Sequence, residues 1–256
     1  MKITVLGCGS SAGVPQINGG WGDCDPDNPK NRRRRSSLLI QTEQTNLLID
    51  CSPDCREQLL EVGLDRLSAV LFTHAHADHC HGVDDLRWIN MAMGEDIPVF
   101  GRPADLDLIE HKFSYAFEPM KKEIKRFYYK PMLVRNDIAE RVSIGDLEIS
   151  TFEQSHGYST TLGLRFGDFA YSTDVVQLDE KAFAALEGVK TWIVDCFRYE
   201  PHQTHSWLEQ TLEWVERVNP EQAYLCHMGR QMDYATVMKD TPDNVEPAYD
   251  GLVIEL

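Results

Sequence analysis

Histidine gathers where one apolar run of the chain ends. Residues 72–82 read FTHAHADHCHG and complete the run LSAVLF, and four of the nine histidines lie between His74 and His81. A continuous apolar run of this length suits a strand buried on both faces. Side chains two positions apart in extended backbone project to the same side, as His74 and His76 would here. A polar helix cap with surface histidines would explain one imidazole, but not the pattern His-x-His-x-Asp-His.

The pattern itself has the chemistry of a metal site. Imidazole nitrogen together with the carboxylate oxygen of Asp78 suits zinc, manganese or iron. Further candidates follow other apolar segments: His156 after LEISTFE, Asp174 after FAYST, and His227 after QAYLC. Layered α/β enzymes build their sites from residues at strand exits along one sheet edge. We therefore expect these side chains to converge, whereas His111, between Glu110 and Lys112, is expected on a helix surface.

The order of expected strands and helices predicts one layered α/β domain over residues 1–256. Strands are expected at 2–7, in a hairpin of SSLLIQT and NLLID, at 67–73 and in IPVFG, and then at 131–135, 147–153, 160–166, 169–173, 191–195, QAYLC and GLVIEL. Helices are expected from Pro53 to Gly63 with Ser52 as the cap, in VDDLRWINMAM, over most of 103–130, and at 179–187 and 206–218. Residues 7–35 read as a long loop.

The amino-acid composition limits the kinds of molecule that the protein is expected to bind. The net charge is −16, which disfavours long polyanions such as DNA or RNA. The run Arg32–Arg35 reverses the charge locally; we favour a solvated or partner-facing loop over a phosphate-facing one. The seven cysteines form no disulfide framework, and most of them are expected to be buried. No segment predicts a membrane helix or a signal peptide, so we expect a cytoplasmic protein without a membrane partner, with a homodimer as a candidate assembly.

The ordered set His74-x-His76-x-Asp78-His79, His156, Asp174 and His227 resembles the metallo-β-lactamase superfamily. The resemblance spans most of the chain and implies a four-layer αββα sandwich with two divalent metal ions, zinc or manganese, at one edge. It implies that His74, His76 and His156 hold one metal and that Asp78, His79 and His227 hold the other. Asp174 would bridge the two, and His81 matches no ligand position.

Within that superfamily, His205 in THSWL resembles the general acid of the phosphodiesterase branches. A general acid contributes typically 10²–10⁴-fold to the departure of an alkoxide. The segments GCGSSAGVPQ, RRRRSSLLI, DCFRYEPHQTH and VEPAYDGLVIEL are similar to PhnP-like cyclic-phosphate phosphodiesterases. The loop has only Cys24, and Arg230 stands where some relatives have a histidine, so no third, structural zinc is expected.

These features predict a metal-dependent phosphodiesterase of a small cyclic or nucleotide-like phosphodiester. A metal-bridging hydroxide would attack, with His205 and Asp78 as catalytic residues. Ser10, Ser11, Arg198 and Arg230 are the candidate substrate contacts, and the aromatic segment 113–130 is a candidate lid or core element. Alternatives left open are a thioester or lactone hydrolase, a tRNA 3′-processing-type nuclease, a weaker flavodiiron reading, and a non-catalytic nucleotide-binding protein.

Overall fold

Two sheets dominate the computed structural model, which describes residues 1–119 and 130–256. Within these residues each sheet has seven strands, in the orders β14-β1-β2-β3-β4-β5-β6 and β13-β12-β11-β10-β9-β8-β7. The first sheet contains β1 Lys2–Gly7, β2 Ser37–Gln41, β3 Asn46–Ile49, β4 Ala69–Leu71, β5 Ile97–Gly101, β6 Leu133–Asp137 and β14 Val253–Glu255. The second contains β7 Arg141–Ile144, β8 Leu147–Ser155, β9 Thr160–Phe166, β10 Phe169–Ser172, β11 Thr191–Asp195, β12 Gln222–Cys226 and β13 Val245–Pro247.

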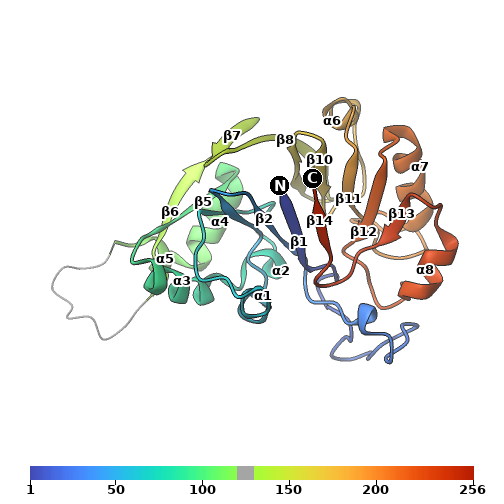
Figure 1. Ribbon diagram of the computed structural model, residues 1–256, viewed down its shortest axis with the longest axis horizontal. Coiled ribbons are helices and arrows are strands. Elements are labelled where there is room, and N and C mark those ends of the chain that lie inside the picture. Colours follow the sequence, from blue (N-terminus) through green and yellow to red (C-terminus); the bar gives the residue numbers. More distant parts are fainter. Residues whose placement is uncertain (120–129) are drawn as a thin grey trace.

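Helices cover the outer faces of both sheets, with α1 to α5 toward one side of the molecule and α6 to α8 toward the other (Figure 1). They are α1 Cys55–Val62, α2 Ala77–Cys80, α3 Leu86–Met93, α4 Pro103–Lys112, α5 Ser114–Phe117, α6 Glu180–Leu186, α7 Leu208–Val218 and α8 Tyr234–Asp240. Two short 3₁₀ turns, Pro29–Asn31 and Val83–Asp85, complete the set. In the described residues, no helix has both the length and the apolar character needed to cross a bilayer.

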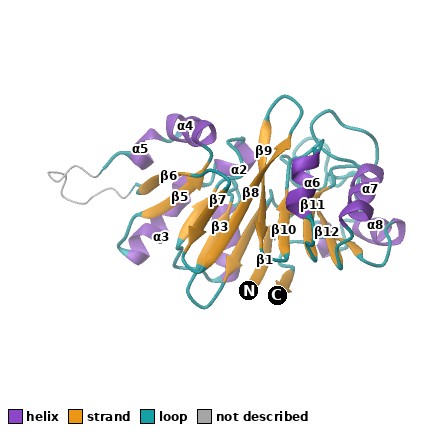
Figure 2. Cartoon of the chain, turned by 90° about the horizontal axis from the view of Figure 1, so that it is seen from above, coloured by secondary structure: helices purple, strands orange, loops and turns teal. Residues whose placement is uncertain are grey.

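The alternation of side chains explains the four layers. On β2, Leu38 and Ile40 belong to the large core that also contains the second sheet, while Leu39 packs in a separate core with α1, α3 and α4. Strand β3 repeats this alternation, with Leu47 and Ile49 in the first core and Leu48 in the second. Successive strand residues point to opposite faces, so these apolar strands are buried on both. Seen from above, the sheets lie between the helices (Figure 2), which confirms the predicted αββα sandwich.

The direction of the strands brings residues from several strand ends to one place. Strands β10, β11 and β12 pair in parallel, and so do β3, β4 and β5. The carboxyl ends of parallel strands meet at one edge of a sheet.

Several predicted boundaries shift. The first predicted helix begins at Cys55 and not at Pro53, because the Ser52 hydroxyl accepts the Asp54 amide hydrogen and closes a turn ahead of the helix. Its end at Gly63 is confirmed, with Gly63 in the left-handed conformation that favours glycine. The strand predicted at 131–135 begins at Leu133. Of the helical stretch predicted over 103–130, α4 and α5 are confirmed, and residues 120–129 lie outside the described residues. All seven cysteines are free and buried.

The arginine run is not a solvated loop, which corrects that expectation. Arg33 is only 2% exposed, and its guanidinium donates to the backbone carbonyls of Gly229 and Met232. Arg34 pairs with Asp250 and Glu61, and Arg35 pairs with Asp54. Only Arg32 is exposed. The run therefore fastens the N-terminal loop to the rest of the molecule.

Candidate active site

Residues that directly follow strands supply most of the site. His156 follows β8, His227 follows β12, and Asp174 lies two residues after β10. His74, His76, Asp78 and His79 come from the turn after β4 and the first residues of α2. Both sheets therefore contribute, and the structure brings together all seven residues that the sequence proposes as ligands.

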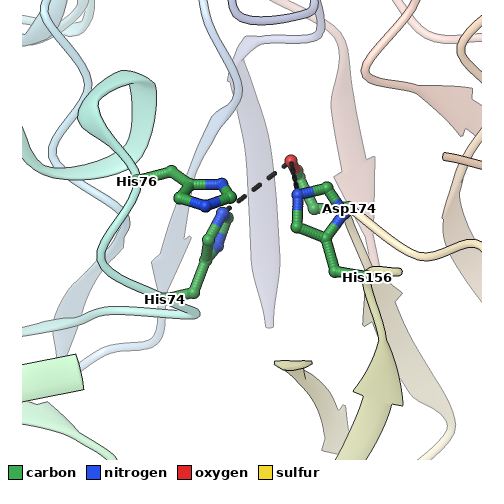
Figure 3. A group of neighbouring side chains, drawn as sticks. All are labelled: His74, His76, His156 and Asp174. Atoms are coloured by element: carbon green, nitrogen blue, oxygen red, sulfur yellow. Dashed lines mark ion pairs between the residues drawn. The ribbon is translucent and has the colours of Figure 1, made fainter. Parts of the chain in front are cut away.

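One group joins His74, His76, His156 and Asp174, whose candidate ligand atoms all lie within 4.8 Å of one another. Figure 3 shows the three imidazoles and the Asp174 carboxylate turned toward one centre. The Nε2 atoms of His74 and His156 lie 3.8 and 3.7 Å from Oδ2 of Asp174.

The second group joins Asp78, His79, Asp174 and His227. Here the Nε2 atoms of His79 and His227 lie 3.1 and 3.4 Å from Oδ1 of Asp174. One carboxylate therefore presents Oδ2 to the first group and Oδ1 to the second, which is the arrangement that a bridging ligand needs.

Hydrogen bonds to the far ring nitrogens orient three of the imidazoles. Asp50 accepts from Nδ1 of His79 at 2.7 Å, and the Thr204 carbonyl accepts from Nδ1 of His156 at 2.6 Å. The Thr73 hydroxyl donates to Asp50, so its oxygen accepts from Nδ1 of His74. In each case Nε2 faces the centre, a pattern typical of metal-ligating histidines.

The residues present fit a divalent metal ion. The Nε2 atoms of His74 and His79 are buried without a hydrogen-bond partner, although buried polar atoms are nearly always satisfied. A cation at the centre would satisfy both, and nitrogen with carboxylate oxygen is a suitable donor set. Asp174 and His227 also hold left-handed backbone conformations, with φ of 53° and 56°. Such strain in residues other than glycine clusters at functional sites.

The protonation states favoured for Asp174 and His74 also suit a metal site. Burial favours the neutral acid of Asp174, but the imidazoles of His227 and His79 outweigh this and hold its pKa well below the usual range. Burial, together with nearby imidazoles, lowers the pKa of His74 well below normal. Burial opposes charge on His79 too, but the Asp174, Asp78 and Asp50 carboxylates raise its pKa. An ionised Asp174 beside a neutral His74 is the protonation state in which both groups bind metal.

His205 lies at the edge of this cluster. Its ring stacks on His227, with centroids 4.6 Å apart, and meets His156 edge-on at 4.8 Å. Its Nδ1 donates to Asp195, a buried carboxylate at the end of β11 that also accepts the Val175 amide hydrogen. Burial favours the neutral ring, but Asp195 outweighs it and raises the pKa of His205 to about 9.

A cavity of about 480 Å³ opens onto the cluster. Its described lining residues are Ser11, His76, Asp78, His156, Tyr158, Ser159, Asp174, Thr204, His205 and His227.

Of the four predicted substrate contacts, only Ser11 lines this cavity. Ser10 is buried, and its amide donates to the Met228 carbonyl. Arg198 donates to the carbonyls of Glu200 and Pro201, and Arg230 donates to the Gly19 carbonyl. His81 is exposed and meets the Phe113 ring edge-on.

The sequence reasoning missed three residues that support the site: Asp50, Asp195 and Thr204. Asp50 directly follows β3 and Asp195 ends β11, so the rule that located Asp174 and His227 would have located both. Thr204 acts through its backbone carbonyl, and residue identity carries no signal for such a role.

Comparisons with known proteins agree with this geometry. The profile of the β-lactamase superfamily domain matches residues 45–228. A solved structure of a diphosphatase from the PhnP family superposes with a TM-score of 0.91 at 28% identity, covering 100% of this chain and 96% of that one.

Two curated relatives are longer than the region they share with this chain. The octanoyltransferase of Porphyromonas gingivalis is 30% identical over 98% of this chain, which spans 51% of that protein. Ribonuclease Z of Methanopyrus kandleri is 28% identical over 52% of this chain and 44% of its own length. The chain thus spans about half the length of these relatives or less. On its profile match, its sheets and its histidine–aspartate cluster, the chain belongs to the metallo-β-lactamase superfamily.

Proposed function

We propose that this chain is a metal-dependent phosphodiesterase that hydrolyses a small cyclic or nucleotide-like phosphodiester with two zinc or manganese ions. The observation that carries the proposal is His205, held by the buried Asp195 at the edge of the two ligand groups. Hydrolysis of an alkyl phosphodiester expels a poor leaving group, which must take up a proton. A cationic imidazole beside the reacting centre supplies one.

The charge of the cavity supports a substrate with a single phosphoryl group. No arginine or lysine is among the described residues that line it. A phosphodiester carries one negative charge, which the metal ions at the centre would neutralise. A second, terminal phosphate would have no cationic side chain in the described lining, so we expect compounds with free terminal phosphates to be poorer substrates.

The residues divide the work as follows. When bound, the ions supply Lewis acidity and a lowered pKa for water. His74, His76 and His156 would hold one ion and Asp78, His79 and His227 the other, with Asp174 between them. His205 uses Nδ1 to bind Asp195, so its Nε2 is the atom free to donate a proton to the leaving oxygen. Asp195 fixes that orientation and keeps the ring charged.

The test compares two leaving groups in the His205→Ala variant. We expect kcat to fall about 10²–10⁴-fold on adenosine 2′,3′-cyclic phosphate, whose alkoxide leaves poorly. The loss on bis(p-nitrophenyl) phosphate should be much smaller, since nitrophenolate leaves without protonation. Metal content, measured by mass spectrometry, should equal that of the wild type. His111→Ala, on the exposed face of α4, is the control. Equal losses on both substrates would contradict the general-acid role.

A second candidate comes from the relatives. The similarity to an octanoyltransferase over 98% of this chain favours acyl chemistry, and so a thioester or ester hydrolase. A thiolate leaves without a proton donor, so that reaction would not require His205. Assaying octanoyl thioesters beside the cyclic phosphate, with wild type and His205→Ala, separates the two: an acyl hydrolase would keep its activity in the variant.

A third candidate is a tRNA 3′-processing nuclease, in view of the ribonuclease Z relative. The net charge of −16 argues against a polyanionic substrate. Cleavage of a precursor tRNA in preference to a cyclic nucleotide would favour the nuclease over the small-molecule phosphodiesterase.

A further inference from the structure

Tyr158 is an exposed aromatic residue at the mouth of the catalytic cavity. It lies in the turn between β8 and β9, two residues after the candidate ligand His156, and it lines the cavity with 87% of its surface exposed. Its hydroxyl donates to Oε1 of Gln203 at 3.0 Å. Gln203 precedes His205 by two positions, so this bond joins the turn to the loop that carries the proposed proton donor, and Tyr158 and His205 line the same cavity.

The turn is pinned against the loop that carries His205. His156 donates to the Thr204 carbonyl at 2.6 Å, and its own amide donates to the Ser159 carbonyl, which closes the turn. A Cβ atom at Gly157 would lie 2.6 Å from the Gln203 carbonyl oxygen, so only glycine permits this approach. The backbone of the turn that carries Tyr158 is therefore held close to the reacting centre, and the bond to Gln203 directs the ring, which is open to solvent.

The other residues that line the cavity have polar side chains. Apart from the histidines and carboxylates of the centre, its described lining consists of Ser11, Ser159 and Thr204 beside Tyr158. Three residues with hydroxyl groups suit a hydroxylated group such as a ribose. An aromatic face suits a planar ring, because offset stacking adds attraction to the burial of apolar area. A volume of about 480 Å³ is in the range of small-molecule sites.

We infer that Tyr158 is a specificity-determining residue that stacks against the base of a nucleoside phosphodiester, while the hydroxyl groups beside it bind the sugar. This inference rests on the proposed phosphodiesterase function and names its substrate class. Nucleoside phosphodiesters and sugar phosphodiesters that lack a base present the same scissile bond to the metal centre. Tyr158 would distinguish them because only the nucleoside compounds carry a base.

The experiment uses a matched pair of substrates, adenosine 2′,3′-cyclic phosphate and methyl β-D-riboside 2,3-cyclic phosphate. The scissile bond is the same, and only the first carries a base. For the metal-loaded wild type we expect a kcat/KM preference for the adenosine compound. Tyr158→Ala should lower that preference roughly tenfold, in line with the usual strength of base–aromatic stacking. Tyr158→Phe keeps the ring without the bond to Gln203 and should retain the preference. Trp88→Ala, which removes an exposed aromatic from α3, is the control.

A binding measurement tests the same point without turnover. Calorimetric titration with adenosine 3′-monophosphate should show about tenfold weaker binding to Tyr158→Ala than to the wild type, with methyl riboside 3-phosphate much less affected. An unchanged preference in Tyr158→Ala, or equal losses on both substrates, would overturn the stacking role and leave the phosphodiesterase proposal intact. A wild type that binds metal yet hydrolyses neither compound would overturn both.

Discussion

Asp50 shows how a residue outside the cavity controls the centre. It is fully buried, it does not line the cavity, and its carboxylate binds Nδ1 of His79 and both donors of Thr73. Its backbone is also left-handed, with φ of 60°. Because Thr73 in turn accepts from His74, one carboxylate orients a proposed ligand of each metal group.

The substitution Asp50→Asn should therefore weaken metal binding without removing a ligand. The amide keeps the size of the side chain but loses the charge that holds His79 in place, and such changes typically lower metal affinity 10–100-fold. Competition with a chromogenic chelator measures this. Asp65→Asn, at an exposed position, is the matched control. Equal affinities in the two variants would show that Asp50 is only structural.

For single residues, the sequence was most informative about side chains whose residue type itself indicates a role, such as histidine and aspartate. His74 and Asp174 are predicted because they follow apolar strands, and His205 because it resembles the general acid of phosphodiesterases; the structure brings these residues together. Tyr158 was missed, because an isolated tyrosine in a turn has no distinguishing pattern. Arg198 and Arg230 were chosen for their charge, but their guanidinium groups bind nearby carbonyls. The charge of a side chain, read from the sequence, does not show where that side chain points in the fold.

Among the elements, the turn between β8 and β9 depends on one glycine. Gly157 has φ of 74° and touches the Gln203 carbonyl, whereas Gly167, in the next turn, has φ of 60° with nothing within 4 Å of a Cβ atom. Both substitutions to alanine strain the backbone by about 1 kcal/mol. Gly157→Ala adds a clash with the loop that carries His205.

We therefore expect Gly157→Ala to lose at least twice as much free energy of unfolding as Gly167→Ala, and to lose activity more than tenfold. Denaturant titration and kcat/KM on the cyclic phosphate measure the two effects. Similar values for the two variants would mean that the loop moves aside freely.

Helix α8 offers a prediction about acid stability. Burial favours the neutral acid of its cap, Asp233, but hydrogen bonds from Thr236, Asn31 and Asp25 outweigh it and lower the pKa to about 2. The ordinary value is about 3.9, so the ionised cap stabilises the fold above pH ~4, and this contribution disappears as the pH falls from about 4 to 2. Partial exposure reduces it to about 1 kcal/mol.

Asp233→Asn should consequently be less stable than the wild type by about 1 kcal/mol at pH 7, with the gap closing near pH 2. Denaturant unfolding at several pH values measures it. A gap that is constant with pH would mean that the carboxylate charge plays no part.

Element prediction followed length and apolar content. The strands β8, β9, β11 and β12 were predicted because each is a long or apolar run that buries much of its surface. Strands β7 and β13 and helix α8 were missed. Strand β7 (RVSI) alternates polar and apolar residues, but it is only four residues long, which is too short for the alternation to stand out. Strand β13 is three residues long and contains a proline.

For the whole molecule, the main consequence is that the candidate ligand set joins the two sheets. His74, His76, Asp78 and His79 follow β4 of the first sheet, while His156, Asp174 and His227 follow strands of the second. A metal ion bound across this boundary binds the folded state only and stabilises the complete sandwich. The αββα arrangement itself was predictable because apolar strands in both halves require two sheets to bury one another.

Removing the metal should therefore lower the melting temperature of the entire domain. With metal at 100 times its Kd the stabilisation is about 2.7 kcal/mol, which corresponds to roughly 5–10 °C for a chain of this size. Calorimetry before and after chelation measures the shift. His227→Ala should show a much smaller shift. An unchanged melting temperature in the wild type would mean that metal binding does not stabilise the packing of the two sheets.

The spread of these ligands along the chain also fixes when the centre can assemble during synthesis. The first candidate ligand is His74 and the last is His227, with the bridge Asp174 between them. While a ribosome is still making the second sheet, the emerging chain has the four residues of the first turn but neither the bridge nor the final histidine. The complete set of candidate ligands is available only after β12 and His227 have left the ribosome, so metal loading would follow the synthesis of most of the second sheet.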